Sequence, residues 1–568
     1  MKKLISVMLA LMMTAVFFSG CESQGNSDAA PQAGNEALQG TSSNNAEATS
    51  SGRKVKLLRI GGTFANDTFS ARSQAGAYGQ ANYYSFSQLN LWRTDEKGEL
   101  TGDGCFFDSW DISDDNLTIT LHFSPLGRLM WHDGTPVTTD DVVFTFNHYK
   151  DHSGASFQKI TNIELISDTS LRLTFSEPVA FGFMHMTTLA TYLLPKHVWE
   201  HVETPRTYRE PNAAIGAGPF RLVSVDKTAQ ISYYEAVEDY PIGDITIDRV
   251  ELKSYDNQTS IILAMLNDQV DVMYTYSSPL DHTLMSLIAG NNDIDPGGSI
   301  DPATYQMIFG FDRYPTNDIN FRKGVAYALD YELIAKMISG EYSEVASTNA
   351  VSSAQLGYVS GYPRNRQDVE LAKQFLDTGG FIDIDNDGFR ELPDGGKMDI
   401  GILIYYYPPD LVPKYRRISE IMKVNLAEAG IRIYVDEQSL AGNRDYILDV
   451  IRNNKYELWL GSTTMSTATW GGIANYVADT ETSGRFFGTL RDPEYLEAYT
   501  RMLVSTNYED YKRAYADIQR MNAELTTAIV WDITHAFYPF RSDKFTGWVN
   551  YPGMGVINGE TWYKTRMK

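Results

Sequence analysis

Apolar and polar residues alternate with two different periods along the chain. A period of two, typical of strands with one buried face, occurs in LTITLHF (residues 117–123) and LRLTF (residues 171–175). A period near 3.6 predicts five helices, at residues 258–267, 319–338, 368–377, 415–429 and 508–524. Because these segments do not follow a strict βαβ order, we expect a mixed α and β fold, of the general class α/β.

The segment WHDGTPVTTDDVVFTF (residues 131–146) places a histidine beside several acidic residues. Its Asp-Gly pair favours a tight turn, and Thr138 or Thr139 can cap the helix that the following apolar residues predict. The next two aspartates then fall in the first turn of that helix, where the helix dipole stabilises negative charge. Since no second catalytic group is apparent near His132, we interpret the segment as part of the scaffold.

The length and the charge of the chain limit the kinds of protein it can be. A chain of 568 residues is longer than one hydrophobic core usually organises, so we expect two or three lobes with clefts at their interfaces. The formal net charge of −24 and the isoelectric point near 4.8 argue against a nucleic-acid partner, which needs clustered lysine and arginine.

The N-terminal region has the pattern of an export signal. Lys2 and Lys3 precede an apolar run from Leu4 to Phe18, and the sequence FFSGC ends at Cys21. This pattern resembles a bacterial lipoprotein signal peptide covering residues 1–20, which implies that Cys21 carries lipid and that the apolar run is removed. An ordinary signal peptide with an incidental cysteine is the alternative.

The composition changes after the predicted signal. Residues 21–52 are rich in Ser, Gly, Asn, Ala and Gln, and we expect them to form a flexible tether. Cys105 is the one other cysteine of the chain. Once Cys21 is lipidated, therefore, neither an internal disulfide nor a four-cysteine metal centre can form.

Eight segments, taken in order, resemble one family of binding proteins. The most diagnostic are LNLWRTDEKGEL, FDSWDISDDNLTITLHF and WHDGTPVTTDDVVFTF, and they are followed by LLPKHVWE, GAGPFRL, FRKGVAYALD, DVELAKQFLDTGGF and YADIQRMNAEL. Each match is weak alone, but their number and order resemble the extracellular solute-binding proteins of family 5. That family comprises the peptide, nickel and oligosaccharide receptors of ABC importers.

This resemblance implies a periplasmic-binding-protein type II-like clamshell with two main lobes and a small extra lobe. The implied boundaries are residues 53–94, 216–308 and 540–568 for lobe I, residues 95–215 for lobe II and residues 309–539 for lobe III. Ligand is then enclosed between lobes I and III by a hinge motion. The resemblance further implies a monomer without enzymatic activity, anchored outside the bacterial membrane by its lipid and working with an ABC permease and its ATPase.

The same resemblance directs attention to residues 458–478, which begin in a predicted strand. Peptide receptors of the family often hold the amino group of their ligand with an acidic residue here, but this segment contains no Asp or Glu. It offers hydroxyl groups and a loop tryptophan, whereas Trp459 lies in an apolar strand and is expected in the core. The candidate ligand-binding residues are Thr463, Thr464, Ser466 and Trp470, with Tyr83 and Tyr84 added by analogy of position. An oligopeptide is the expected ligand, and an oligosaccharide is the alternative.

A different class of function is indicated by HVWEH, which fits the H-x-x-E-H pattern of an inverted zinc peptidase. In that interpretation His197 and His201 are zinc ligands on one helical face, and Glu200 is the general base. The sequence names no third ligand, and the motif overlaps a segment that resembles the solute-binding family. An extracytoplasmic zinc hydrolase is therefore an alternative from another class.

An acidic loop begins with the sequence DIDNDG. Asp383, Asp385 and Asp387 occupy positions 1, 3 and 5 of a calcium-binding loop, and Glu391 can contact the ion through water. The twelfth position holds an aspartate, which is shorter than the bidentate glutamate that such loops prefer. A structural calcium ion and a solvated hairpin both fit this pattern, and we expect no other cofactor.

Overall fold

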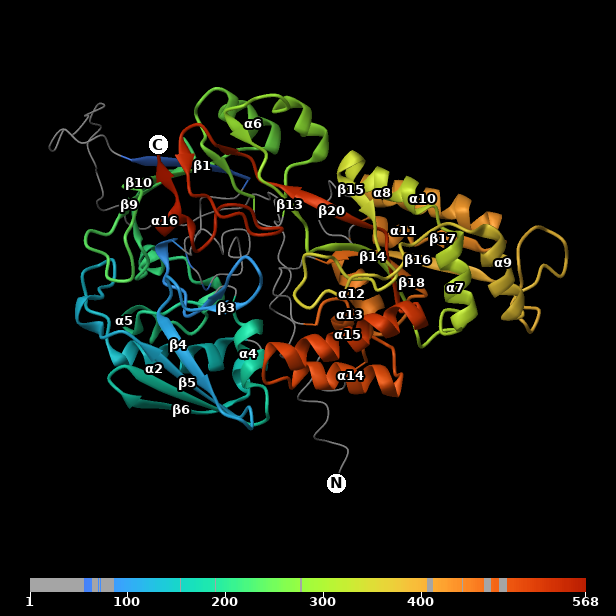
Figure 1. Cartoon of the computed structure of the whole chain (residues 1–568), viewed down its shortest axis with the longest axis horizontal. Helices are drawn as coiled ribbons and strands as arrows, with labels where there is room; N and C mark the ends of the chain where they lie inside the picture. The colour runs from blue at the N-terminus through green and yellow to red at the C-terminus, as the bar shows by residue number, and fades with distance from the viewer. Residues whose placement is uncertain are drawn as a thin grey trace, which may run out of the picture.

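The structure is a computed structural model in which three bodies are each built around a β-sheet (Figure 1). It describes residues 56–63, 70, 72, 86–153, 155–188, 191–275, 278–405, 412–441, 443–463, 471–479 and 488–568. The lobe boundaries expected from the sequence stay a prediction. Below, lobes I, II and III denote the bodies built on the seven-, four- and five-stranded sheets. Within the described ranges, no helix has the length and apolar character needed to span a bilayer.

Lobe I combines segments that are far apart in the chain. Its sheet has the order β12-β21-β11-β1-β10-β9-β8. In chain order the strands are β1 (Leu57–Gly62), β8 (Phe220–Asp226), β9 (Ile231–Ala236), β10 (Arg249–Ser254), β11 (Val272–Met273), β12 (Ile294–Asp295) and β21 (Phe540–Arg541). β1 runs parallel to both of its neighbours, and helix α6 (Gln258–Leu266) packs beside it. The C-terminal turn α16 (Thr561–Lys564) and the pair β22 (Phe545–Thr546) and β23 (Arg566–Met567) complete this lobe.

Lobe II contains an antiparallel sheet in the order β4-β5-β7-β6, with helix α2 (Thr139–His152) packed on one face. The strands are β4 (Phe107–Ile112), β5 (Thr118–Phe123), β6 (Ile160–Ser167) and β7 (Ser170–Phe175). The short elements are β2 (Arg93–Thr94), β3 (Leu100–Thr101), α3 (Ala155–Gln158), α4 (Ala180–Met186) and α5 (Lys196–Trp199). Both strands predicted from the two-residue period are present as β5 and β7, each with alternate side chains in the core.

Lobe III has a sheet that is covered on both faces. Its order is β17-β16-β18-β14-β19, with β14 (Thr304–Phe309), β16 (Asp399–Tyr405), β17 (Arg432–Val435), β18 (Leu458–Thr463) and β19 (Ala528–Val530). Helices α7 (Ile319–Ala328), α8 (Tyr331–Ser339), α9 (Val369–Thr378) and α10 (Val412–Glu428) pack on one face. Helices α12 (Arg444–Arg452), α13 (Ala474–Val477), α14 (Pro493–Leu503) and α15 (Tyr508–Leu525) pack on the other, and α11 (Glu437–Leu440) follows β17. Trp459 is fully buried, as predicted.

The helix predicted at residues 319–338 is two helices, so that prediction is wrong in its continuity. Leu329 has an extended backbone, and Asp330 caps α8 by accepting a hydrogen bond from the Leu333 amide at 2.9 Å. An aspartate side chain that binds a nearby amide favours a helix start over a helix interior. The other four predicted helices are present as α6, α9, α10 and α15, with ends shifted by a few residues.

Two antiparallel strands carry the chain between lobes I and III. β13 (Gly298–Ile300) leads from β12 to β14, and β20 (Asp532–Phe537) leads from β19 back to β21. The two crossings pair with each other, and β15 (Ser343–Val345) pairs with β20 on its other side. Figure 1 shows this three-stranded sheet between the two bodies. We refer to β13 and β20 as the hinge strands, because the two bodies can rotate relative to each other only by bending here.

Candidate ligand-binding site

Most ligand-binding residues expected from the sequence lie outside the described residues. These are Tyr83, Tyr84, Thr464, Ser466 and Trp470, and the predicted lipid attachment residue Cys21 lies outside them as well. Thr463 is the last residue of β18, and its backbone pairs with that of Thr304 at the start of β14. Because β14 directly follows the hinge strand β13, the end of β18 lies at the hinge. The segment that carries the predicted residues therefore starts there.

Two buried carboxyl groups lie on the hinge strands. Asp301 follows β13 and Asp532 begins β20, with exposed fractions of 8% and 1%. Asp301 Oδ1 accepts a hydrogen bond from the Ala303 amide at 2.9 Å, and Asp532 Oδ2 accepts one from the Ser339 hydroxyl at 3.2 Å. In the described part of the chain, Oδ1 of Asp532 has no hydrogen-bond partner. Burial raises the pKa of Asp301 to about 6 and that of Asp532 to about 7.

A lysine from lobe III lies near Asp532. Lys414, in the first turn of α10, is half-buried, and its ammonium lies 5.3 Å from the ring centroid of Tyr305 on β14. Burial lowers the pKa of Lys414, while the charges of Asp532 and of Asp281 in lobe I act in the opposite direction. Lys414 forms neither an ion pair nor a hydrogen bond with the described residues. It is therefore a partly desolvated cation available to a ligand, and with Asp281, Asp301 and Asp532 it forms what we call the hinge cluster.

Aromatic contacts connect lobes I and III beside the hinge strands. His282, in the 3-10 turn His282–Leu287 of lobe I, stacks on Tyr342 with ring centroids 5.4 Å apart and an interplanar angle of 19°. Its Nε2–H donates a hydrogen bond to the His535 carbonyl at 3.1 Å, and Phe537 packs against its edge. These contacts hold the hinge strands against both bodies.

A second contact joins lobes II and III away from the hinge strands. Tyr508, at the start of α15, accepts a hydrogen bond from the Leu100 amide at 2.5 Å, and its hydroxyl lies 3.2 Å from His185 Nε2 in α4. The Asn116 side-chain amide also donates to the carbonyls of Val504 and Ser505, both at 3.3 Å. Lobe III is thus held by lobe I through the hinge strands and by lobe II through these polar contacts.

The family model for bacterial extracellular solute-binding proteins, family 5, matches residues 105–482. The chain belongs to this family. A putative ABC transporter peptide-binding protein of Brucella ovis is 24% identical over 347 residues, which cover 57% of this chain and 58% of the relative. The chain spans about half the length of the curated relatives it matches first. Because the family consists of solute-binding proteins, the prediction that the chain is not an enzyme is confirmed.

Solved structures show the same fold. AppA of Bacillus subtilis, in complex with a nonapeptide, superposes with a TM-score of 0.66 at 17% identity, over 91% of this chain and all of that one. A periplasmic oligopeptide-binding protein of Thermotoga maritima, with bound mannohexaose, gives a TM-score of 0.65 at 19% identity, over 91% of this chain and all of that one. The expected clamshell of the periplasmic-binding-protein type II-like class is therefore confirmed.

The H-x-x-E-H motif of this solute-binding protein does not form a zinc site. The Nε2–H of His197 donates to Asp133 Oδ2 at 2.8 Å, while His201 is largely exposed beside Glu200. The helix that carries the motif, α5, is a single turn. Among the described residues, the side chains that gather closely enough for a metal ion are acidic and lie on another loop. The zinc-hydrolase alternative is therefore wrong, because the turn directs its two histidines to different partners.

The segment around His132 is structural in this solute-binding protein. Its Nε2–H donates to the Gly218 carbonyl at 2.9 Å, and loss of water around the ring lowers the pKa of His132 to about 4. Thr138 is the N-cap of α2, and its amide and hydroxyl both donate to Asp141 in a reciprocal capping box. A neutral, hydrogen-bonded histidine beside a capped helix supports the interpretation as scaffold.

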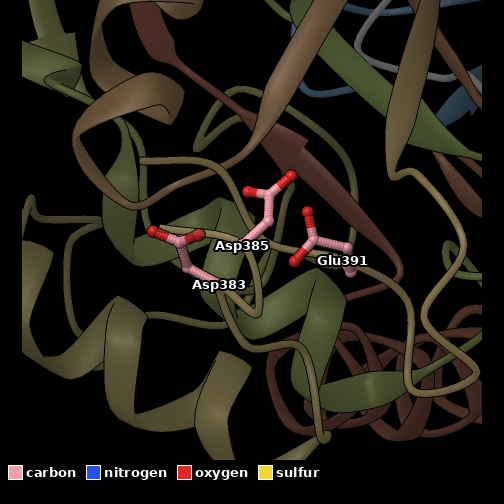
Figure 2. Close-up of side chains that lie close together, drawn as sticks. All are labelled: Asp383, Asp385 and Glu391. Atoms are coloured by element: carbon pink, nitrogen blue, oxygen red, sulfur yellow. The ribbon is translucent and has the colours of Figure 1, made fainter. Parts of the chain in front are cut away.

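Three of the four predicted calcium ligands lie together on one loop (Figure 2). Oxygen atoms of Asp383, Asp385 and Glu391 come within 4.8 Å of one another. Asp387 instead forms an ion pair with Arg432 at 2.8 Å. Backbone amides of the loop also donate to the clustered carboxylates; Gly388 donates to Asp383 and Ile384 to Glu391. Because these bonds can hold the loop without an ion, calcium binding stays a prediction.

The sequence interpretation missed the hinge cluster. Asp532 interrupts the apolar stretch AIVWDI, and an acid inside a buried strand is a signal that could have been used. Lys414 carries no such signal, because a lysine in the first turn of a helix is usually solvated. Its position beside Tyr305 and near Asp281 follows only from how the lobes pack.

Proposed function

We propose that this solute-binding protein captures an oligopeptide between lobes I and III and delivers it to an ABC import permease. The observation that carries the proposal is the hinge cluster: Lys414 is a partly buried cation that forms no ion pair or hydrogen bond with the described residues, and the charges of Asp281 and Asp532 act on it. A peptide carries a carboxylate at one end and an ammonium at the other. Lys414 can bind the carboxylate, and the acids supply the negative charge that residues 458–478 lack.

The comparisons support a peptide ligand without deciding it. The relative from Brucella ovis is named as a peptide-binding protein, and AppA holds a nonapeptide. The Thermotoga maritima protein holds mannohexaose, which supports the oligosaccharide alternative. Closure on either ligand is a hinge motion driven by contacts that form only in the closed state.

Binding of matched peptides to matched variants tests the proposal. Lys414→Met should weaken binding of a free-acid peptide about 10- to 100-fold, because a hydrogen bond to a charged group contributes roughly 1.5 to 3 kcal/mol. Lys423→Met, an exposed lysine on the same helix, serves as the control and should bind as the wild type does. A C-terminally amidated peptide should bind the wild type as weakly as the free acid binds Lys414→Met. Equal affinity of the wild type for the amide and the acid would exclude Lys414 as the carboxylate partner.

Thermal-shift screening separates the two ligand classes. A ligand at one hundred times its dissociation constant stabilises a protein by about 2.7 kcal/mol. Stabilisation by a peptide pool supports the proposal. Stabilisation by an oligosaccharide panel alone would instead identify the ligand as an oligosaccharide.

We further propose that Cys21 carries lipid and anchors the protein outside the bacterial membrane. The proposal rests on the lysines, the apolar run and the small residues before Cys21. Cys21→Ser should release the protein from the membrane fraction in cells. Continued tight membrane association of this variant would contradict lipid anchoring.

A further inference from the structure

Four basic side chains gather at the C-terminal end of α2 in lobe II. Two of them, His148 and His152, lie on successive turns of α2 with ring centroids 4.7 Å apart. Arg72 lies over the ring of Tyr149, with its guanidinium carbon 4.4 Å from the centroid. Its Nη2–H donates to the Ser153 hydroxyl at 2.9 Å. Arg206, from the 3-10 turn Pro205–Thr207, completes the group, which we call the basic cluster.

The two arginines of the basic cluster repel each other, and their charges act on its histidines. Burial lowers the pKa of Arg72, Tyr149 opposes this shift, and the charge of Arg206 adds to it. Burial and the charge of Arg72 lower the pKa of His148 to about 3. The pKa of His152 is lowered by burial and by the charges of Arg72 and Arg206, and Asp151 opposes this shift only in part. The two arginines therefore carry the positive charge of the basic cluster, and His148 is neutral.

The basic cluster lacks negative partners within the described part of the chain. None of its four side chains forms an ion pair with a described carboxylate. Nε of Arg72 and Nε2 of His148 are buried without hydrogen-bond partners, and the His148 side chain is 4% exposed. Buried charged groups are normally paired, because an unpaired one loses its hydration without compensation. Arg206 and His152 are only partly buried, so an ion can approach from solvent.

We propose that the basic cluster binds an oxyanion, a carboxylate or a phosphate group. The planar guanidinium of Arg72 presents its N–H donors in the fork geometry that matches such groups, and Arg206 adds a second positive charge. His148 is uncharged and can donate one N–H or accept one, so it adjusts to the bound group. The oxyanion is either free in solution or part of a larger solute. The basic cluster contains no residue of the hinge cluster, so this site stands whether or not the transported solute is a peptide.

Calorimetric titration of the purified protein with inorganic phosphate and with succinate tests the site. We expect saturable binding of at least one of these anions by the wild type. Arg206→Gln should weaken that binding about tenfold or more, because it removes a charge-assisted contact at a partly exposed position. Arg209→Gln is the matched control, since this exposed arginine lies on the same loop and donates to the backbone carbonyls of Arg206 and Tyr208. It should leave the binding unchanged.

A second variant distinguishes loss of the anion site from misfolding. Arg72→Gln should lose the anion while its far-ultraviolet circular dichroism stays that of the wild type. If neither free anion binds, an acidic peptide and its neutral amide are compared in the wild type and in Arg206→Gln. A loss confined to the acidic peptide assigns the oxyanion to the solute. Unchanged binding of every probe in both arginine variants, or no saturable binding of any anionic probe by the wild type, would overturn the proposal.

Discussion

The hydroxyl of Tyr508 in lobe III lies 3.2 Å from Nε2 of His185 in lobe II. The other ring nitrogen of His185 donates to the Phe181 carbonyl at 3.1 Å, so Nε2 is the acceptor and the Tyr508 hydroxyl is the donor. The same hydroxyl accepts from the Leu100 amide. Burial lowers the pKa of His185 to about 4, which keeps its ring neutral and able to accept. Lobes II and III, which come from distant parts of the chain, are thereby joined through the hydroxyl of Tyr508.

Removing this hydroxyl should loosen the contact between lobes II and III. Tyr508→Phe leaves the Leu100 amide without its acceptor, at a cost of about 1 to 2 kcal/mol to the arrangement in which the lobes touch. We expect a larger radius of gyration for the ligand-free variant in small-angle X-ray scattering. Tyr314→Phe is the control, because this phenol is 49% exposed and makes no hydrogen bond in the described structure. Identical scattering of the two variants would show that the contact does not hold the lobes together.

The buried carboxyl of Asp532 should make stability depend on pH. Its pKa is raised to about 7 in the folded chain, above an unfolded value near 3.8, so the folded state holds this proton more tightly. The contribution of Asp532 to the free energy of unfolding is therefore complete below about pH 3.8 and is lost as the pH rises to about 7. Asp532→Asn removes the titration. The unfolding free energy of the variant minus that of the wild type should therefore increase between these pH values.

The size of this effect follows from the pKa difference. One pKa unit corresponds to about 1.4 kcal/mol, so the increase should be at most roughly 4 kcal/mol, with a plateau above about pH 7. Urea unfolding at several pH values measures it. A difference that stays constant from pH 4 to pH 8 would mean that Asp532 is ionised throughout.

The sequence allowed either Thr138 or Thr139 to cap α2, and in the structure Thr138 is the N-cap. Thr138→Ala removes the hydroxyl that accepts from the Asp141 amide and should destabilise the protein by about 1 kcal/mol. Thr139→Ala, one residue into the helix, should change stability by much less. Equal losses in thermal unfolding would place the cap elsewhere.

The predicted calcium site should depend on Asp385 but not on Asp387. If the loop binds calcium, chelation should lower the melting temperature of the wild type, and Asp385→Asn should remove that response. Asp387→Asn should retain the response, because Asp387 faces Arg432 and not the other carboxylates. A melting temperature that is insensitive to chelator would favour the solvated hairpin.

Local patterns of the sequence were sufficient to predict several helices and strands. β5 and β7 follow from strict alternation, and α6, α9, α10 and α15 follow from their helical period, because burial of one face imposes these periods on any chain. The order of short motifs was sufficient for the family. The boundary between α7 and α8 was missed, since the apolar period continues across Asp330 while its side chain ends one helix and starts the next.

Interactions between distant segments could be decided only by the tertiary structure. Lys414 is 118 positions before Asp532, and Arg72 is 134 positions before Arg206. No periodicity links such pairs, because chain distance carries no information on spatial distance once three lobes fold over one another. The sequence by itself determined the strands β5 and β7, several of the helices and the family of this protein. Which charges became buried and which of them kept no partner was decided when the lobes packed, because desolvation depends on neighbours that the local sequence does not contain.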